Sequence, residues 1–439
     1  MTRGFNEDMR MGLEKFSSTD VKEIFGRIPE KRVGEQDIKY VWEVLNAGFG
    51  NSDRSGIIGR FEEAFARKFG VDYAISHCNG TATMHSCLLA AGIGPGDEVI
   101  VPALTMASTA LVAIYCYAVP VFADIDPATF TISVEDVKRK ITPFTKAIIP
   151  VSIYGLSPDM DPIMELAKEY DLTVIEDNAQ CYLGYYKGRL VGTLGHAASF
   201  SFQGSKHMTT SGEGGIVICN DPELAFKIRK AGLLGYSSIS AKPGSVCIPR
   251  DIRQNWEFKR HDGFGYNFRL ASICAALGLG QLERLEDLVA ARQAVARLYE
   301  EVVSKCKWLT AQYVPEGYVN SWWTYACRLD EDIAGINWRT FRKKFIEFGG
   351  DGLYSAWYPV HLEPVFRDMN FYGDPLRAPH YHPLYKGRVK SYQPGDCPVL
   401  ERIQPTLMQL KTGYSNPNEP VEQAEALWKT IRYFEQAGS

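Results

Sequence analysis

The chain has 439 residues, with 48 Lys and Arg against 52 Asp and Glu and a formal net charge of -4. This length exceeds a single compact core and suits a large domain joined to a smaller one. The near balance of charge excludes an electrostatic case for nucleic acid or an anionic membrane surface, so we expect a small-molecule partner.

The ten cysteines are scattered, without a CxxC pair, and no histidine cluster has metal-ligand spacing. We therefore expect reduced thiols and no metal site. The opening residues 1–10 are polar, which predicts no secretory leader and a cytoplasmic location. The uncharged run 99–123 is long enough to cross a bilayer, but Pro102 and Pro120 interrupt it. We interpret that run as strand, loop, short buried helix and strand of a protein with no membrane partner.

Predicted strands and helices alternate along the first part of the chain. Apolar residues at helical spacing predict helices at 59–69 and 82–91. Short apolar runs predict strands at 73–76, 98–101, 119–123, 147–151, 173–176, 198–202 and 215–219. Strands separated by helices indicate an α/β fold with a mostly parallel sheet covered on both faces. Ligands of such sheets bind at the carboxyl ends of the strands.

The pattern changes near residue 285, where a long amphipathic helix is predicted to run to 304. After it we expect a smaller α+β domain with a strand at 322–329 and helices at 338–348 and 421–437, and with a long loop at 371–395 rich in Pro, Tyr and Gly. The predicted organisation is an N-terminal segment 1–34, a large domain 35–288 and a small C-terminal domain 289–439.

Chemically useful side chains follow two of the predicted strands. Asp177 stands directly after the apolar strand ending at Glu176, and Lys206 follows the strand that contains Ser201. A buried carboxylate at a strand end needs a cationic partner. Pyridoxal 5'-phosphate (PLP) enzymes need a Schiff-base lysine, a carboxylate opposite the ring nitrogen, and hydroxyls or amides for the phosphate. Lys206, Asp177, Ser201 and Thr81 are of the required types.

Several runs together resemble the sugar aminotransferases of the DegT/DnrJ/StrS family over residues 33–285. The matching runs are 79–82, 94–102, 174–180, 199–202 leading to Lys206, 212–215 and 265–269. The resemblance implies a fold type I aminotransferase, with a seven-stranded type of sheet between helices. It also implies a homodimer with active sites shared between the subunits.

The resemblance also implies roles for residues around the cofactor. Lys206 would form the Schiff base and then move the proton, and Asp177 would pair with the pyridinium nitrogen. Gln180 would contact the ring oxygen or lie over the ring face. The phosphate would be bound by residues at a strand end and a helix N-terminus, namely Ser201, Gly80, Thr81 and Ala82.

Three further assignments keep a structural alternative open. Met106 stands where the family usually has an aromatic residue over the ring, and it would cover that face or fill the core. Asn267 would reach the phosphate from the partner subunit, or serve as a turn residue. His361 would border the substrate pocket, or be a satisfied structural histidine. The insertion 237–260 would fold over the site or only extend the surface.

The predicted activity is PLP-dependent transfer of an amino group from glutamate or glutamine to a keto-sugar. A nucleotide-linked keto-deoxysugar is the preferred acceptor, and a ketocyclitol, another polyol ketone or a small phosphorylated ketone is the alternative. A PLP-dependent sugar dehydratase would replace the lysine by histidine, and here His207 is adjacent while Lys206 keeps the lysine position. A non-enzymatic sensor of the same fold is the remaining alternative.

Overall fold

A seven-stranded sheet forms the centre of the molecule, in a computed structural model that describes residues 18–29, 31–48, 56–244 and 250–437. The strand order is β1-β9-β8-β5-β4-β2-β3. The strands are β1 (Tyr73–His77), β2 (Glu98–Pro102), β3 (Val119–Ala123), β4 (Thr145–Ile148), β5 (Thr173–Asp177), β8 (Ala197–Ser201) and β9 (Gly215–Cys219). In this sheet β9 pairs antiparallel with both β1 and β8, and the other neighbouring strands pair in parallel. The predicted mostly parallel α/β sheet is confirmed.

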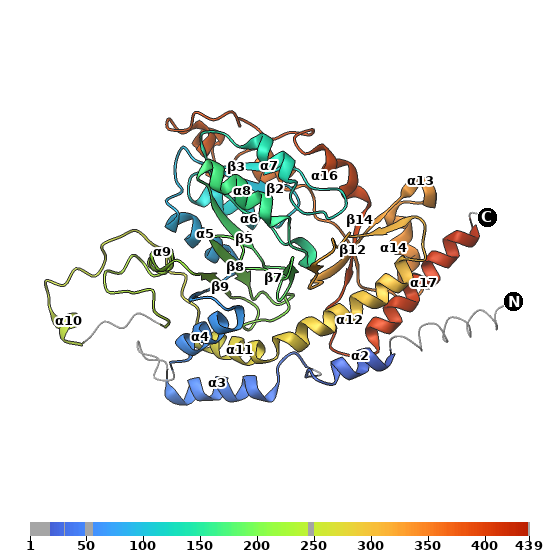
Figure 1. Ribbon diagram of the computed structural model, residues 1–439, viewed down its shortest axis with the longest axis horizontal. Helices are drawn as coiled ribbons and strands as arrows, with labels where there is room; N and C mark the ends of the chain where they lie inside the picture. The colour runs from blue at the N-terminus through green and yellow to red at the C-terminus, as the bar shows by residue number, and fades with distance from the viewer. Residues whose placement is uncertain (1–17, 30, 49–55, 245–249, 438–439) are drawn as a thin grey trace.

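Helices cover both faces of this sheet (Figure 1). One face packs against α5 (Gly80–Ala90), α6 (Ser108–Tyr115) and α9 (Pro222–Gly232), and the other against α4 (Ile57–Phe69), α7 (Val134–Lys140), α8 (Met160–Tyr170) and α11 (Ser272–Glu283). Both faces of β9 are apolar, which explains why both are covered by helices. Val217 joins the core under α5, whereas Ile216 and Ile218 join the core under α4 and α11. A strand buried on both faces reads as a continuous apolar run.

Several predicted elements differ from the structure at their ends, and two of these differences have a clear local cause. The strand predicted at 147–151 ends at Ile148, because Pro150 has no N–H with which to continue a ladder. The helix predicted from residue 82 begins at Gly80, since the Asn79 side chain accepts a hydrogen bond of 2.8 Å from the Ala82 N–H. The uncharged run 99–123 folds as β2, α6 and β3, and no helix in the described ranges is long and apolar enough to cross a membrane.

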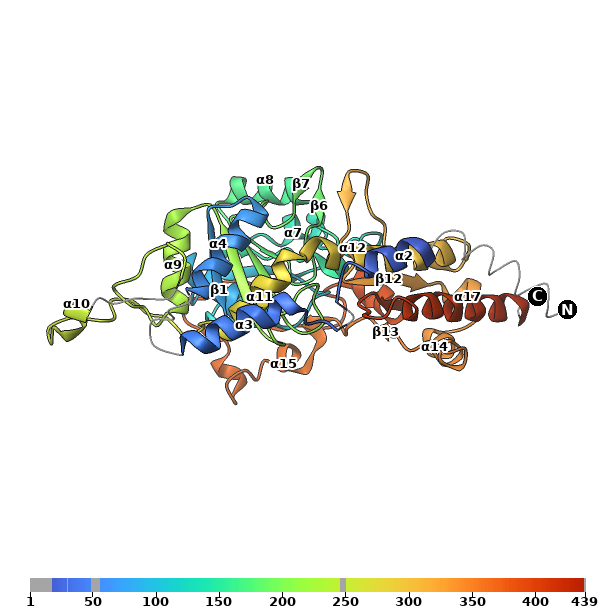
Figure 2. The ribbon, with the colours of Figure 1, turned by 90° about the horizontal axis from the view of Figure 1, so that it is seen from below.

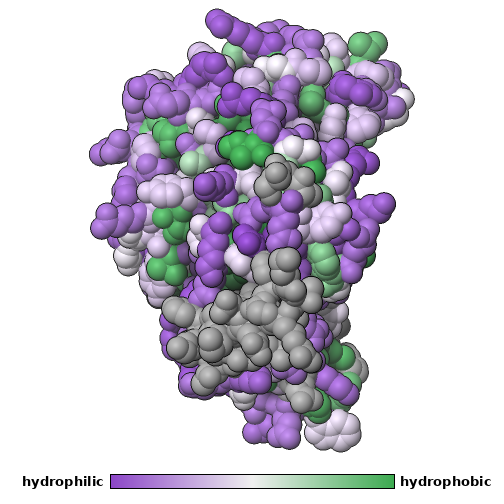
Figure 3. Space-filling model, turned by 90° about the vertical axis from the view of Figure 1, so that its right-hand side faces the viewer, coloured by the Kyte–Doolittle hydropathy of each residue, from purple (hydrophilic) through white to green (hydrophobic). Residues whose placement is uncertain are grey.

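The long helix α12 (Leu285–Val303) connects the large sheet to a four-stranded antiparallel sheet of order β10-β12-β14-β13 (Figures 1 and 2). Its elements are β10 (Leu309–Ala311), β12 (Thr324–Leu329), β13 (Leu353–Ser355), β14 (Leu407–Lys411), α13 (Glu331–Ala334), α14 (Trp338–Glu347) and α17 (Glu419–Ala437). The smaller α+β part is thus confirmed, while the exact boundaries of the domains stay a prediction. The surface at this end of the molecule is mainly hydrophilic, with scattered apolar residues (Figure 3).

The N-terminal part of the chain contains two helices that the sequence did not predict. α2 (Ser18–Phe25) inserts Val21 and Phe25 into the core that α12, α14 and α17 share with the four-stranded sheet. α3 (Glu35–Ala47) packs on α11. The described part of the chain therefore begins beside its C-terminal helices and then crosses to the large sheet (Figure 2).

The remaining elements are short. β6 (Tyr185–Tyr186), β7 (Arg189–Leu190) and β11 (Tyr318–Val319) form a small third sheet. Short helical turns are η1 (Ile153–Gly155), η2 (Val360–Leu362), α15 (Pro364–Arg367), η3 (Pro375–Arg377), η4 (Pro379–Tyr381), α16 (Pro398–Ile403) and η5 (Gln404–Thr406). The insertion 237–260 carries α10 (Arg250–Gln254), which projects away from the body of its own chain in Figures 1 and 2.

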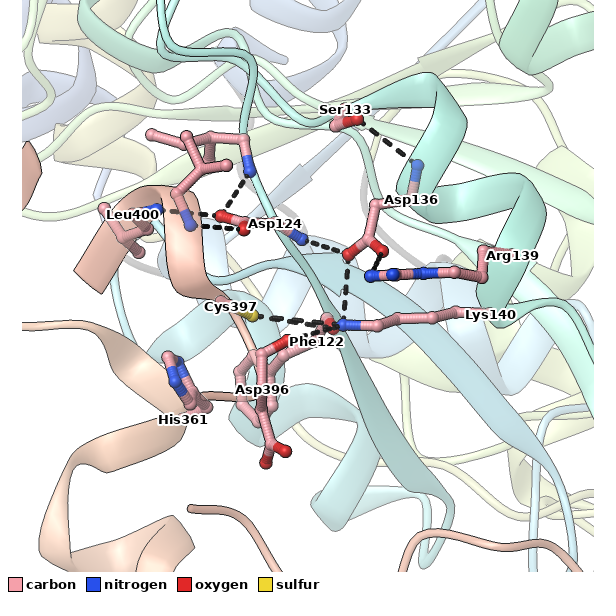
Figure 4. A network of polar contacts seen from close by, with 12 residues as sticks. Phe122, Asp124, Ser133, Asp136, Arg139, Lys140, His361, Asp396, Cys397 and Leu400 are labelled. Carbon is pink, nitrogen blue, oxygen red and sulfur yellow. Dashed lines mark hydrogen bonds and ion pairs between the residues drawn. The ribbon is translucent and has the colours of Figure 1, made fainter. Parts of the chain in front are cut away.

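The segment that follows the predicted loop 371–395 is joined to the large sheet by a polar network (Figure 4). Asp124, just after β3, accepts hydrogen bonds from the N–H groups of Val399 and Leu400 at 2.7 and 2.9 Å. Lys140 pairs with Asp136 at 3.0 Å and donates to the carbonyls of Phe122 and Asp396. These contacts satisfy the first N–H groups of α16 and fix it against β3.

Replacing Asp124 by alanine should therefore destabilise the protein, because the α16 N–H groups lose their buried acceptor. We expect a loss of about 2 kcal/mol of unfolding free energy, measured by urea titration of the cofactor-free protein. The control is Asp368→Ala, which removes an exposed carboxylate and should leave the midpoint almost unchanged. Equal midpoints for the two variants would refute the anchoring role.

Candidate active site

The ends of β5 and β8 bring the predicted catalytic residues together. Asp177 is the last residue of β5 and Ser201 the last of β8, and the two strands pair in parallel with Asp177 opposite Ser199. Lys206 follows β8 in a loop whose turn is closed by a 2.9 Å bond from its N–H to the Gln203 carbonyl. The predicted meeting of Asp177 and Lys206 at one edge of the sheet is therefore present.

Asp177 is a buried carboxylate whose hydrogen-bond donors are neutral. Its oxygens accept from the Thr109 hydroxyl at 2.8 Å and from the Ala179 N–H at 3.1 Å. Burial raises the pKa of Asp177, and the Ala179 and Thr109 bonds and the charge of Lys206 oppose that rise. Among the described residues no cation forms an ion pair with Asp177. The cationic partner that the sequence predicted is thus not supplied by a side chain in direct contact.

Lys206 is positioned as a reactive amine. Its Nζ lies 4.2 Å from the centroid of the Trp323 ring. Burial lowers the pKa of Lys206 to about 8; the charge of Asp177 opposes this effect and that of Arg292 adds to it. A lysine with such a pKa is partly neutral near physiological pH, and the neutral form is the nucleophile and the base.

The start of α5 forms a concave surface of amide groups beside Ser201. A Cβ atom placed on Gly80 would lie 2.7 Å from the Ser201 Cβ, so only glycine permits this approach. Asn79 caps the Ala82 N–H. Within the described part of the chain, the N–H groups of Gly80 and Thr81 have no hydrogen-bond partner. Free N–H groups at the start of a helix next to a hydroxyl suit a phosphate.

The residues present fit PLP by this test. The buried carboxylate without a cation in contact would suit a protonated ring nitrogen, the α5 N-terminus and Ser201 would suit a phosphate, and Lys206 would supply the amine for a Schiff base. The fit depends on the types of donors and acceptors and on their burial.

The other predicted residues are placed as follows. The Gln180 Oε1 accepts from the Tyr154 N–H at 2.7 Å, which fixes the amide beside Asp177. Met106 directly precedes α6 and is 56% exposed, so it is not core filler within this chain. Asn267 is exposed, and its backbone bridges Leu233. The roles of these three residues toward a cofactor stay predictions.

His361 lies in η2 and is fully buried. Its Nε2 is 2.9 Å from the Glu401 Oε1, and its ring packs against Phe122. Figure 4 shows it near Asp396 and Cys397. Its Nδ1 is buried and has no hydrogen-bond partner among the described residues, so only one of the two ring nitrogens is paired. Both the structural role and the contact with substrate that the sequence left open stay predictions.

His207 does not occupy the lysine position. It is buried, with its Nε2 2.9 Å from the Ser321 carbonyl and its ring tilted against Tyr182. Lys206, the neighbouring residue, is the one whose charge interacts with Asp177. The geometry therefore does not support histidine in place of the lysine, as a sugar dehydratase would need.

Four residues of this region were not assigned from the sequence. Thr109 donates to Asp177, Trp323 lies beside the Lys206 amine, and Arg32 and Arg292 donate to the backbone of the Lys206 loop. Thr109 had a detectable signal, because a buried carboxylate needs donors and a threonine begins a nearby helix. The other three come from distant segments whose approach only the tertiary structure reveals.

A cavity of about 770 Å³ lies on the backbone side of the Lys206 loop, between that loop, α12 and the four-stranded sheet. Its cationic lining residues are Arg32, Arg292, Arg342 and Lys411. Aromatic walls come from Trp323, Trp338, Tyr354, Trp357 and Tyr414. Among the described residues no Asp or Glu lines it, so the cavity favours an anionic ligand.

The comparisons with known proteins agree with this fold and site. The model of the DegT/DnrJ/EryC1/StrS aminotransferase family matches residues 31–423, and the chain belongs to that family. GDP-perosamine synthase of Caulobacter vibrioides is 38% identical over 355 residues, covering 80% of this chain and 89% of that protein. The enzyme of the same name from Escherichia coli O157:H7 is 40% identical over 332 residues, covering 75% and 84% respectively.

Solved structures extend the agreement to the whole fold. The X-ray structure of an aminotransferase from Psychrobacter cryohalolentis has a TM-score of 0.79 and 27% sequence identity, covering 92% of this chain and 98% of that one. The crystal structure of 3-amino-5-hydroxybenzoic acid synthase has a TM-score of 0.73 and 25% identity, covering 91% and 97%. The predicted family and fold class are confirmed.

Asp177 should raise the pKa of Lys206, and its removal tests whether the two groups interact. In the cofactor-free Asp177→Asn variant we expect the pKa of Lys206 to fall below about 8, because the opposing charge is lost. The measurement is competitive acetylation with acetic anhydride across pH, followed at each lysine by mass spectrometry. Asp171→Asn is the control. Asp171 is exposed and lies between the end of α8 and the start of β5, and asparagine tolerates its positive φ of 54°. An unchanged or raised pKa in Asp177→Asn would contradict the coupling.

Proposed function

We propose that this protein is a PLP-dependent aminotransferase that moves an amino group from glutamate or glutamine to a nucleotide-linked keto-sugar. The observation that carries the proposal is the position of a partly buried lysine, Lys206, near the buried carboxylate of Asp177, which forms no ion pair with a cation among the described residues. Membership of the family and the names of the curated relatives support the sugar acceptor. A homodimer in the cytoplasm is part of the same proposal.

Each side chain would have a defined task. Asp177, held by Thr109, would keep the ring nitrogen protonated, which makes bound PLP an electron sink. Ser201 and the N–H groups of Gly80 and Thr81 would hold the phosphate. Lys206 would bond the cofactor, and after displacement by an amine it would carry the proton between substrate and cofactor carbons.

The remaining residues would complete the enclosure. Met106, exposed in the single chain, would cover one face of the ring, and Gln180 would approach the ring from the side fixed by Tyr154. Asn267, also exposed, would reach the phosphate of the partner subunit's site. Two exposed residues that are needed at a buried cofactor are the reason to include the dimer in the proposal.

The acceptor is proposed from the cavity beside the Lys206 loop. Arg342 and Lys411 line it, and the described lining has no carboxylate to neutralise them. A diphosphate would find charge-assisted donors there, and the aromatic walls would pack against a base or a sugar ring. A neutral ketocyclitol would leave these cations unused, so the cavity favours the nucleotide-linked acceptor over that alternative.

The half-reaction tests the proposed activity. Protein loaded with PLP should show a visible absorption band that is lost on addition of L-glutamate as the cofactor takes up the amino group, and Lys206→Ala should lack this response. Absorption spectra before and after glutamate, repeated with glutamine, are the measurement. A band that neither donor changes would overturn the assignment.

If the cavity binds the acceptor, changes in its cationic lining should affect the half-reaction with the acceptor and not the half-reaction with glutamate. Lys411→Ala and Arg342→Ala should each raise the KM for a nucleotide-linked 4-keto deoxysugar about tenfold, the loss expected for a charge-assisted bond to phosphate. The rate with glutamate alone should stay unchanged. Lys343→Ala, an exposed neighbour of Arg342 on α14, is the control. If the glutamate half-reaction slows by the same factor, the cavity does not bind the acceptor.

A further inference from the structure

Arg292 is a buried cation that has no carboxylate partner among the described residues. It lies on α12 and is 8% exposed. Its Nη1 donates to the Trp323 carbonyl at 2.7 Å and to the Thr412 hydroxyl at 3.2 Å, and its Nη2 donates to the carbonyls of Ser205 and Lys206 at 2.8 and 3.1 Å. All these acceptors are neutral, so the positive charge of Arg292 is not cancelled where it lies.

The backbone of the Lys206 loop accepts hydrogen bonds from three separate segments, which carry Arg32, Arg292 and Trp323. Arg32, which precedes α3, donates to the carbonyls of Gly204 and Lys206. The Trp323 Nε1 donates to the Ser205 carbonyl at 3.0 Å. The Lys206 carbonyl thus accepts from two guanidinium groups. The main chain of the loop is fixed by these donors, and the Lys206 side chain extends from that fixed base.

We propose that Arg292 is a positioning residue for Lys206, which clamps the loop and places an uncancelled positive charge behind the amine. The inference rests on the proposed role of Lys206 in the reaction. A planar guanidinium can reach the carbonyls of consecutive residues at once, which an ammonium cannot. The adjacent Gly413 leaves room for it, because a Cβ there would lie 2.8 Å from the Arg292 Nη2.

Several charged groups face Lys206, and they act in opposite directions. Asp177 at the end of β5 and Glu213 in the connection between β8 and β9 raise the pKa of Lys206, whereas burial and Arg292 lower it. Burial holds the pKa of His207 well below its ordinary value, so that ring is neutral and contributes no charge. Arg292 is therefore the side chain that offsets the two carboxylates and favours the neutral amine.

The test uses the cofactor-free protein, so that it does not depend on transaminase activity. In Arg292→Met we expect the pKa of Lys206 to rise from about 8 by about one pH unit, measured by competitive acetylation and mass spectrometry. Arg292→Gln, which retains a donor but not the charge, should give a similar rise. Arg292→Lys, which retains the charge but not the planar guanidinium, should keep the pKa of Lys206 close to about 8.

The matched control is Arg297→Met, which removes an exposed arginine from the same helix and should leave the pKa of Lys206 unchanged. Lys140, held by Asp136, reports in the same spectra whether each variant is folded. A folded Arg292→Met with an unchanged Lys206 pKa overturns the proposal, as does an equal rise in Arg297→Met. If Arg292→Met does not fold, the folded Arg292→Gln variant takes its place, and an unchanged pKa of Lys206 in that variant overturns the proposal. A failed glutamate half-reaction with the expected pKa changes would refute the proposed function but not this inference.

Discussion

The burial of opposite charges at the ends of adjacent parallel strands is the constraint on which this site depends. Asp177 and Lys206 are both largely removed from water, and burial alone would neutralise each of them. Their mutual attraction and the neutral donors around Asp177 oppose that tendency. The result is a carboxylate ready to pair with a cationic ring and an amine whose pKa of about 8 leaves part of it neutral near physiological pH, which is the combination that transamination needs.

The sheet and its covering helices were predictable because their determinants are local. Apolar runs such as 119–123 and 215–219 coincide with strands, and β9 shows the two-sided burial expected of such runs. The strand predicted at 147–151 ended early because Pro150 cannot donate a ladder hydrogen bond. The helices α2 and α3 were not predicted, since α2 is held mainly by its contacts with α12 and the second core.

The residues of the candidate site also divide into those with a local sequence signal and those without one. Lys206, Asp177, Ser201 and Gly80 carry a signal in the order and spacing of short motifs. Arg292 and Trp323 carry none, because Arg292 lies on α12 and Trp323 directly before β12, and each meets the Lys206 loop only after folding. For His361 the motif predicts a substrate contact, and the structure adds the contact of its ring with Glu401, which only folding brings close.

The covalent attachment of the cofactor tests the central claim most directly. Protein loaded with PLP would be reduced with borohydride, digested and examined by mass spectrometry for the lysine that carries the phosphopyridoxyl group. We predict this mass on the peptide containing Lys206 and on no other lysine, since Lys206 is the reactive amine opposite Asp177. A modification on a different lysine, or none at all in protein that binds PLP, would contradict the account.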